Sequence, residues 1–244
     1  MINEQAIPQM MVSTGDALGL LLVYLYVAAV VIFARILDKR GYDDCKRKTV
    51  HILVGNIVFI WWVFDSPYIM AFLAAAPFIP LLYLVSPACR TGRFKETFLG
   101  SASKEGHDLG LMYYAISWTL LAFFLFDYRA AASVGIVAMA YGDGMGGFIG
   151  KRIGKRKFKN GKSVEGTIAV FCTTTIAVTC VLLFYQWLNT MGIHETAQLT
   201  LPFILLVAPL MGIFVALVEL VTPGKWDNLI IPISSALIMV ALGV

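Results

Sequence analysis

Charged side chains are scarce in this sequence. Only 14% of its 244 residues are Asp, Glu, Lys or Arg, whereas 59% are hydrophobic. An ordinary soluble domain has about a quarter of its residues charged, so this composition excludes a soluble globular protein. The residues before the first apolar run contain no lysine or arginine. The basic segment that opens a cleaved signal peptide is therefore missing, and the first run is expected to be a retained span.

Cysteine is also rare, and its spacing is irregular. The four cysteines form no CxxC pair and have no Cys/His spacing typical of zinc sites. Neither a disulfide framework nor a zinc centre is indicated. No internal repeat is found, and no pair of matching broken helices suggests an inverted-repeat transporter.

Long apolar runs fill the sequence instead. A helix needs about 20 apolar residues to cross about 30 Å of hydrocarbon, and such runs recur with no room left for a separate soluble domain. The sequence therefore predicts one domain, residues 1–244, with an all-α fold: a polytopic transmembrane helix bundle of about seven or eight spans. The expected spans are 16–35, 49–64, 67–86, 108–126, 130–150, 164–186, 199–222 and 228–244.

Positive charge is concentrated in one set of connections. If the spans alternate in direction, the connections 36–48, 87–107, 151–163 and 223–227 lie on one side of the membrane. Together with Arg35 they hold eighteen of the nineteen Lys and Arg residues. The positive-inside rule assigns this side to the cytosol. The net charge of +4 is thus a topology signal and gives no support to nucleic-acid binding.

One aspartate stands among glycines at the end of an apolar run, in AYGDGMGGFIGKR, residues 140–152. A carboxylate in the hydrocarbon region is costly, so a functional role is the default interpretation of Asp143. The alternative is a helix-end side chain that reaches water beside Lys151 and Arg152. The surrounding glycines allow close helix packing or close approach of a phosphate. Packing explains the glycines but does not explain the acid.

Two nucleotide motifs match this region only superficially. Gly142, Gly144 and Gly147 satisfy GxGxxG, but the run belongs to a membrane span and follows no β-strand, which a dinucleotide fold requires. NGKS at 160–163 resembles part of a P-loop, yet Arg156 occupies the position of its first glycine. We therefore predict neither a dinucleotide-binding fold nor a P-loop.

A basic connection follows the glycine segment. For most of its cations we expect anchoring to anionic lipid headgroups. Lys162 differs because it directly precedes a predicted helix start, where free N–H groups and the helix dipole favour a phosphate. Glu165, three residues later, is placed to hold Mg²⁺. The cations of this connection are Lys151, Arg152, Lys155, Arg156, Lys157, Lys159 and Lys162.

Three segments together resemble a known family. GDGMGGFIGKRIGKRKFKNGKSVEGTIA, residues 142–169, resembles the signature of the CTP-dependent lipid-alcohol kinases, which include dolichol, phytol and farnesol kinases and a CTP-using diacylglycerol kinase. KRKTVHILVGN, residues 46–56, resembles the RKxxH segment of the family, and ALVELVTPGKWDNLIIP, residues 216–232, resembles its closing E…DN…P pattern. The resemblance covers about residues 45 to 235, and the central segment is its most specific part.

The resemblance implies a reaction and its partners. A nucleoside triphosphate, CTP, would give its γ-phosphate to the hydroxyl of a membrane lipid alcohol of the polyprenol, dolichol, phytol or geranylgeraniol type, with Mg²⁺ as cofactor. On the topology derived from charge, all three segments fall at cytosolic helix ends, so the active site is expected to face the cytosol. Nothing in the sequence specifies an oligomeric state.

The resemblance also implies a set of site residues. Three carboxylates would bind the metal or accept the alcohol proton, with Asp143 and Glu165 as the metal ligands and Asp227 as the preferred base. His51 fits an interhelical hydrogen bond equally well, and Glu219 also fits pairing with a lysine. The catalytic set is Asp143, Lys162, Glu165 and Asp227; the nucleotide or phosphate set is Lys48, Gly144, Arg152, Gly161, Ser163, Gly166 and Asn228; further candidates are Arg47, His51 and Glu219.

Other functions remain as alternatives. A phosphatidate cytidylyltransferase also carries a glycine-rich acidic segment and GKxxEG, but its longer acidic C-terminal signature is absent: after Glu165 the only acids are Glu195, Glu219 and Asp227. A diacylglycerol kinase would differ in the acceptor. An ion-coupled carrier would explain intramembrane acids such as Asp143 but not the GKSVEG segment.

Overall fold

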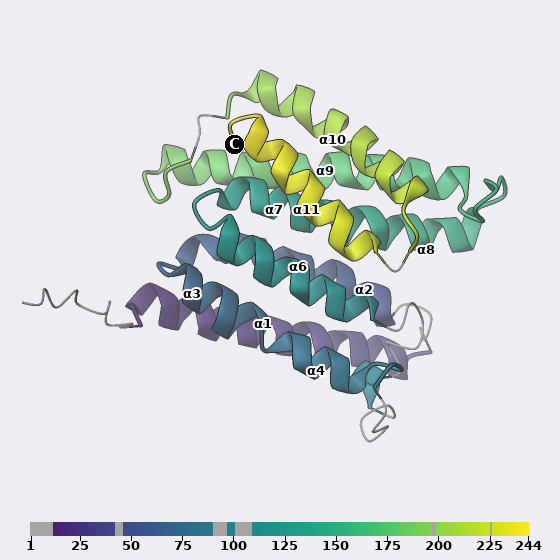
Figure 1. Ribbon diagram of the computed structural model, residues 1–244, viewed down its shortest axis with the longest axis horizontal. Helices are drawn as coiled ribbons and strands as arrows, with labels where there is room; N and C mark the ends of the chain where they lie inside the picture. The colour runs from purple at the N-terminus through teal and green to yellow at the C-terminus, as the bar shows by residue number, and fades with distance from the viewer. Residues whose placement is uncertain (1–11, 42–45, 90–96, 101–108, 197–198, 225) are drawn as a thin grey trace, which may run out of the picture.

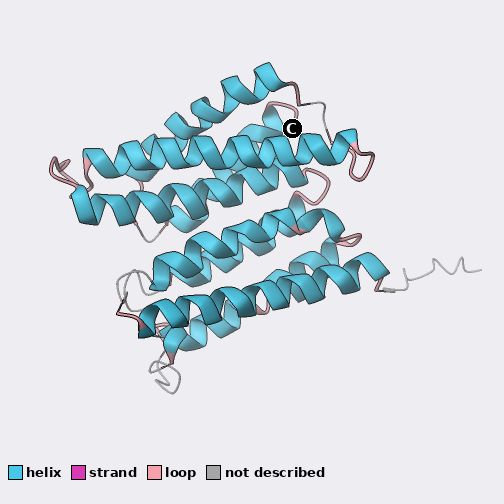
Figure 2. Cartoon of the chain, turned by 180° about the vertical axis from the view of Figure 1, so that it is seen from behind, coloured by secondary structure: helices cyan, strands magenta, loops and turns pink. Residues whose placement is uncertain are grey.

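The computed structural model describes residues 12–41, 46–89, 97–100, 109–196, 199–224 and 226–244. Throughout these residues the regular elements are helices that run side by side in one bundle (Figure 1). The view from behind shows the same arrangement without a strand in the described ranges (Figure 2). The all-α prediction is confirmed.

Every predicted span is helical, with ends that shift by a few residues. The short second span is the least regular, because its α-helix passes into two 3₁₀ segments. The elements are α1 (Thr14–Lys39); α2 (Lys46–Val54) with 3₁₀ segments Gly55–Phe59 and Trp61–Val63; α3 (Pro67–Ile69), a π-helical segment (Met70–Ala75) and α4 (Phe78–Val85); α6 (Gly110–Phe124); α7 (Arg129–Val137), a second π-helical segment (Ala138–Asp143) and α8 (Gly144–Ile153); α9 (Val164–Thr190); α10 (Leu201–Val221); and α11 (Asp227–Ala241).

Five of these helical stretches in the described part of the chain are long and apolar enough to cross a membrane: Thr14–Lys39, Pro67–Val85, Arg129–Ile153, Val164–Thr190 and Leu201–Val221. Two more, Gly110–Phe124 and Asp227–Ala241, are apolar but shorter. Many of their large hydrophobic side chains face outward, as expected where the surroundings are lipid. The chain is a polytopic membrane protein.

The basic connections lie at one end of the bundle. The C-terminal ends of α1, α8 and α10 meet the N-terminal ends of α2, α9 and α11 on the right of Figure 1. Most of the connection 87–107 lies outside the described residues. Arg129 lies at the opposite end, where its guanidinium donates to the carbonyl oxygens of Trp61, Trp62 and Phe64 at 3.2, 3.3 and 2.8 Å. The charge asymmetry of the sequence is therefore an asymmetry of the folded bundle.

Small residues let the central helix pack closely against its neighbours. The stretch Arg129–Ile153 is the most buried of the five long helices, and Gly135 of α7 faces the carbonyl oxygen of Pro232 in α11. A Cβ atom at Gly135 would collide with that backbone oxygen. Close approach of helices at such positions is typical of membrane bundles.

We expect Gly135→Val to destabilise the protein in detergent by about 1–3 kcal/mol. The clash would be with a backbone atom of α11, which cannot move aside by a change of side-chain rotamer. Thermal unfolding followed by circular dichroism measures this effect. Ala28→Val is the matched control, since Ala28 is exposed on α1. Equal melting temperatures for Gly135→Val and the wild type would show that the α7–α11 contact is not tight.

Candidate active site

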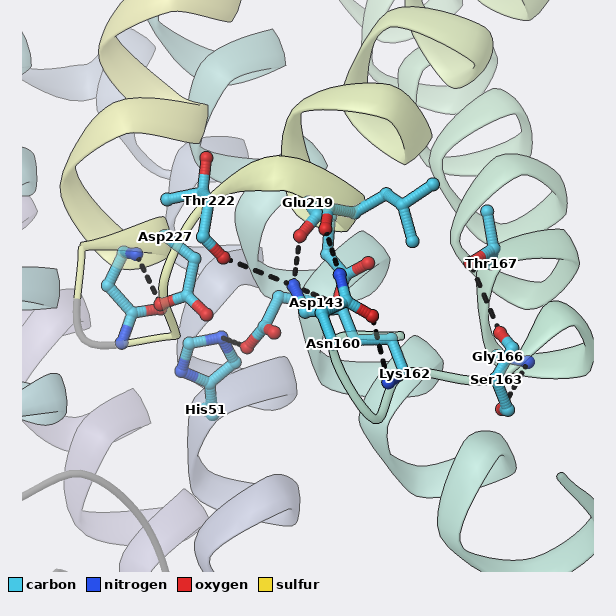
Figure 3. A network of polar contacts seen from close by, with 12 residues as sticks. His51, Asp143, Asn160, Lys162, Ser163, Gly166, Thr167, Glu219, Thr222 and Asp227 are labelled. Carbon is cyan, nitrogen blue, oxygen red and sulfur yellow. Dashed lines mark hydrogen bonds and ion pairs between the residues drawn. The ribbon is translucent and has the colours of Figure 1, made fainter. Parts of the chain in front are cut away.

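Asp143 faces two side chains of α2. It lies where the π-helical segment Ala138–Asp143 passes into α8, and π-helical turns occur frequently at functional sites. Its Oδ2 atom lies 3.7 Å from Lys48 Nζ. The same oxygen lies 3.7 Å from His51 Nε2 (Figure 3). Lys48 Nζ also donates to the Asp143 carbonyl oxygen at 3.2 Å. At 3.7 Å neither side-chain contact is a hydrogen bond, so this carboxylate oxygen keeps room to bind a ligand.

Glycines beside Asp143 let α2 come close. A Cβ atom at Gly144 would lie 2.5 Å from Ile52 Cγ1, and one at Gly147 would lie 2.7 Å from Lys48 Nζ. A bulkier residue at position 144 would push α2 away from Asp143, and one at position 147 would displace the Lys48 amine. Gly144, predicted to bind nucleotide, thus has a packing contact with α2 in the structure.

The start of α11 adds a second carboxylate. Asp227 and Asn228 are both buried there. The backbone N–H of Asn228 donates to Asp227 Oδ1 at 2.8 Å, and its Nδ2 donates to the Gly110 carbonyl oxygen at 2.8 Å. The Asp227 carboxylate lies close enough to Asp143 for electrostatic interaction (Figure 3). Asp143 and Asp227, which come from different helices, therefore lie in one region, which we call the acidic region.

Asn228 also presents an unused oxygen. Its Oδ1 atom is buried and has no hydrogen-bond partner within the described part of the chain. Those residues contain no group of three or more His, Cys, Asp or Glu side chains placed to hold a metal ion. A magnesium ion commonly binds one or two carboxylates together with waters and substrate phosphates. Asp143, Asp227 and the free oxygen of Asn228 are oxygen ligands of the type that such a site uses.

A cleft of about 370 Å³ opens along α8, the helix that follows Asp143 in the chain. It lies between α8, the connection to α9, and the adjoining ends of α9 and α10, and we call it the glycine cleft. Its walls combine exposed backbone with cationic side chains, which is the surface that phosphates require. The lining residues are Gly146, Gly147, Gly150, Lys151, Gly154, Lys157, Gly161, Lys162, Ser163, Gly166, Thr167 and Glu219.

Lys162 reaches across the glycine cleft to α10. Gly161 has a φ of +84°, a conformation that favours glycine, and so turns the chain just before this lysine. Lys162 Nζ lies 2.9 Å from Glu219 Oε1 and also donates to the carbonyl oxygens of Glu219 and Thr222 (Figure 3). Its charge also acts on the carboxylate of Asp143. Lys162 thus links the cleft to the acidic region.

The N-terminus of α9 differs from the sequence-based expectation. Ser163 Oγ accepts from the Gly166 N–H at 3.1 Å, and the Ser163 carbonyl oxygen accepts from the Thr167 N–H at 3.0 Å. The Val164 N–H donates to the Arg156 carbonyl oxygen at 2.9 Å. The prediction of free N–H groups at this helix start is therefore wrong for Val164 and Gly166, which bond to the preceding loop and to the Ser163 side chain.

Glu165 points toward the loop that precedes α9. Its carboxylate accepts from the backbone N–H groups of Lys155 and Arg156 at 3.1 and 3.4 Å. Among the described residues, no hydrogen bond or ion pair joins it to Asp143. Its role as a metal ligand stays a prediction. In the folded chain it holds the basic loop against the start of α9.

The remaining basic residues differ in whether they reach the acidic region or the glycine cleft. Arg47 approaches Gly110 next to the side-chain amide of Asn228, which places it in the acidic region. Arg152 stacks over the Phe148 ring at 4.2 Å and does not line the glycine cleft. Lys151 and Lys157 do line it, although the sequence assigned them to headgroup anchoring. Nothing in the sequence distinguishes them from the neighbouring cations.

Comparison with known proteins places this chain in a family. No family model matches the chain, and no solved structure matches it significantly. A phytol kinase of Synechocystis sp. is 31% identical over 222 residues, which cover 87% of this chain and 86% of the relative. The probable phytol kinase 2, chloroplastic, of Oryza sativa subsp. japonica is 28% identical, covering 86% of this chain and 70% of the relative.

The farnesol kinase, chloroplastic, of Arabidopsis thaliana is 29% identical over 213 residues, covering 82% of this chain and 67% of the relative. These similarities extend over most of the chain. The chain belongs to the phytol kinase family of membrane lipid-alcohol kinases.

Proposed function

We propose that this protein transfers the γ-phosphoryl group of CTP to the hydroxyl of an isoprenoid alcohol of the phytol, geranylgeraniol or polyprenol type. The observation that carries the proposal is the position of Asp143, which faces Lys48 and His51 and lies within electrostatic range of Lys162. Phosphoryl transfer needs such a junction of cations and carboxylates. The relatives named as phytol and farnesol kinases support an isoprenoid acceptor.

The glycine cleft is the proposed place of the nucleotide phosphates. Lys151, Lys157 and Lys162 line it and would neutralise negative charge as the γ-phosphoryl group moves. Charge-assisted hydrogen bonds from fixed cations are usually a large part of catalysis in this reaction class. Lys162 is held by Glu219, so bound phosphate would share this lysine or draw it away from that acid.

Magnesium is proposed to bind between Asp143, Asp227 and the free oxygen of Asn228. When bound, the ion would neutralise phosphate charge and orient the γ-phosphoryl group. Glu165, the other ligand predicted from the sequence, would first have to release the N–H groups of Lys155 and Arg156.

The acceptor hydroxyl is proposed to lie beside Asp143 and His51. Its oxygen would attack the γ-phosphorus, the bond between that phosphorus and the bridging oxygen would break, and CDP would leave. A carboxylate of the Asp143–Asp227 pair would take the alcohol proton, which is the role of a general base. We propose that this end of the bundle faces the cytosol, because it carries the basic connections.

An assay with radiolabelled nucleotide tests the proposed function. Purified protein in lipid nanodiscs receives Mg²⁺, γ-labelled CTP or ATP, and phytol, geranylgeraniol, a long polyprenol or diacylglycerol. We expect a labelled isoprenoid monophosphate with CTP, and its loss when EDTA removes the metal. Labelling from ATP alone would contradict the choice of donor, and labelling of diacylglycerol alone would contradict the acceptor. A CDP-lipid formed from phosphatidate and α-labelled CTP would instead identify a cytidylyltransferase.

A further inference from the structure

An apolar groove, separate from the glycine cleft, is lined by His51. Its volume is about 160 Å³, and it is bounded by α1, α2, the π-helical segment with α4, and α6. Its walls include Val27, Val54, Ala75, Ala115 and Trp118. The proposed phosphoryl transfer uses none of these residues. The proposed chemistry therefore leaves this groove unexplained.

His51 connects this groove to Asp143. Its side chain is only 3% exposed, lines the groove, and has an Nε2 atom without a hydrogen-bond partner in the described chain. The ring stacks on Tyr114 at a centroid distance of 4.6 Å, and the Tyr114 hydroxyl donates to the His51 carbonyl oxygen at 3.1 Å. These contacts fix His51 between an apolar space on one side and Asp143 on the other.

We infer that this groove holds the hydrocarbon chain of the acceptor, with the hydroxyl at His51 and Asp143. The inference rests on the proposed function and adds a location for the substrate chain inside the bundle. A buried polar atom with no partner has a high free-energy cost unless a ligand satisfies it. An alcohol oxygen at the end of an apolar chain supplies that partner and fills the groove at the same time.

The dimensions of the groove favour a single isoprenoid chain. Along α6 it runs from Leu111 to Trp118, about 10 Å at 1.5 Å per residue, so it holds only the part of a long chain nearest the hydroxyl. Leu81 of α4 lines it and is 44% exposed, so the groove is open to the bilayer along α4. The small side chains of Ala75 and Ala115 leave space for methyl branches.

Filling the deep end of the groove tests this location. Ala75 is almost fully buried and lies well along the span from the end that carries His51. We expect Ala75→Leu to lower kcat/KM for phytol about tenfold or more, while kcat/KM for the short alcohol prenol stays close to wild type. Ala28→Leu, on the exposed face of α1, is the matched control and should leave both values unchanged.

A photolabelling experiment on the wild-type protein gives an answer even if Ala75→Leu fails to fold. A diazirine analogue of geranylgeraniol is cross-linked in nanodiscs, and labelled peptides are identified by mass spectrometry. We expect label on the groove-lining residues of α4 and α6, displaced by unlabelled phytol. Label confined to outward-facing residues such as Leu21 and Leu25 of α1 would overturn the inference.

The two proposals fail in different ways. Absence of kinase activity toward every isoprenoid alcohol would refute the proposed function, even if the groove were labelled. Wild-type kinase activity together with an unchanged kcat/KM for phytol in a well-folded Ala75→Leu would refute only the groove. Equal losses for phytol and prenol would also count against it, because a blocked deep end affects long chains alone.

Discussion

Asp143→Asn is expected to lower kcat by about a thousandfold, the loss typical of removing a group that acts directly on charge or protons in the transition state. Asparagine keeps the shape of the side chain, and the carbonyl oxygen of residue 143 still accepts from Lys48. The substitution therefore removes the negative charge with little change in packing. Initial rates of lipid phosphate formation at saturating CTP and Mg²⁺ measure the effect.

The matched control for this substitution is Asp127→Asn. Asp127 is exposed in the connection between α6 and α7, at the opposite end of the bundle, so the same chemical change there should leave activity intact. Circular dichroism and size-exclusion profiles in detergent establish that both variants are folded. Activity of Asp143→Asn within a few fold of wild type would remove Asp143 from the catalytic set.

Lys162→Ala is expected to lower kcat/KM for CTP by about a hundredfold or more, because a cation aimed at transferring phosphate is removed. Lys162 is the only cation of the described part of the glycine cleft that contacts the end of α10, through Glu219 and Thr222. Nucleotide titrations at fixed acceptor concentration measure the change. Lys159→Ala is the matched control, since Lys159 is an exposed lysine of the same loop that does not line the cleft.

A double substitution separates the two consequences of losing Lys162. The single variant leaves Glu219 buried without its lysine, and an unpaired buried acid is itself destabilising. Lys162→Ala with Glu219→Gln removes that acid's charge. We expect the double variant to regain thermal stability while activity stays low. Recovery of activity would show that Lys162 only neutralises Glu219.

Local sequence was enough to predict the spans and the chemistry-bearing segments. Hydrophobic length decides where a helix crosses lipid, and the predicted spans coincide with the helices despite small shifts at their ends. The segments around Asp143, Lys162 and Asp227 were also identifiable, because an acid or a glycine–lysine pair in an apolar chain is conspicuous. Alternating span direction placed them at a common end, where the structure has them.

The contacts among those segments depended on tertiary structure. The sequence left the glycines near Asp143 open between packing and phosphate binding. The approach of α2 gives Gly144 a packing role, whereas Gly147 lines the glycine cleft. It predicted free N–H groups at the start of α9, which Ser163 and the preceding loop instead occupy. Such hydrogen bonds depend on how a loop folds back, which no local pattern encodes.

The sequence by itself determined that the chain is a helical membrane protein with a kinase-like signature, since hydropathy, charge asymmetry and motif spacing are properties of short segments. Tertiary structure decided which side chains meet: Lys162 with Glu219, His51 with Asp143, and the apolar groove with His51. The physical reason is that side chains become buried and paired where helices distant in sequence pack against each other. Which face of a helix is buried depends on the helices that pack against it.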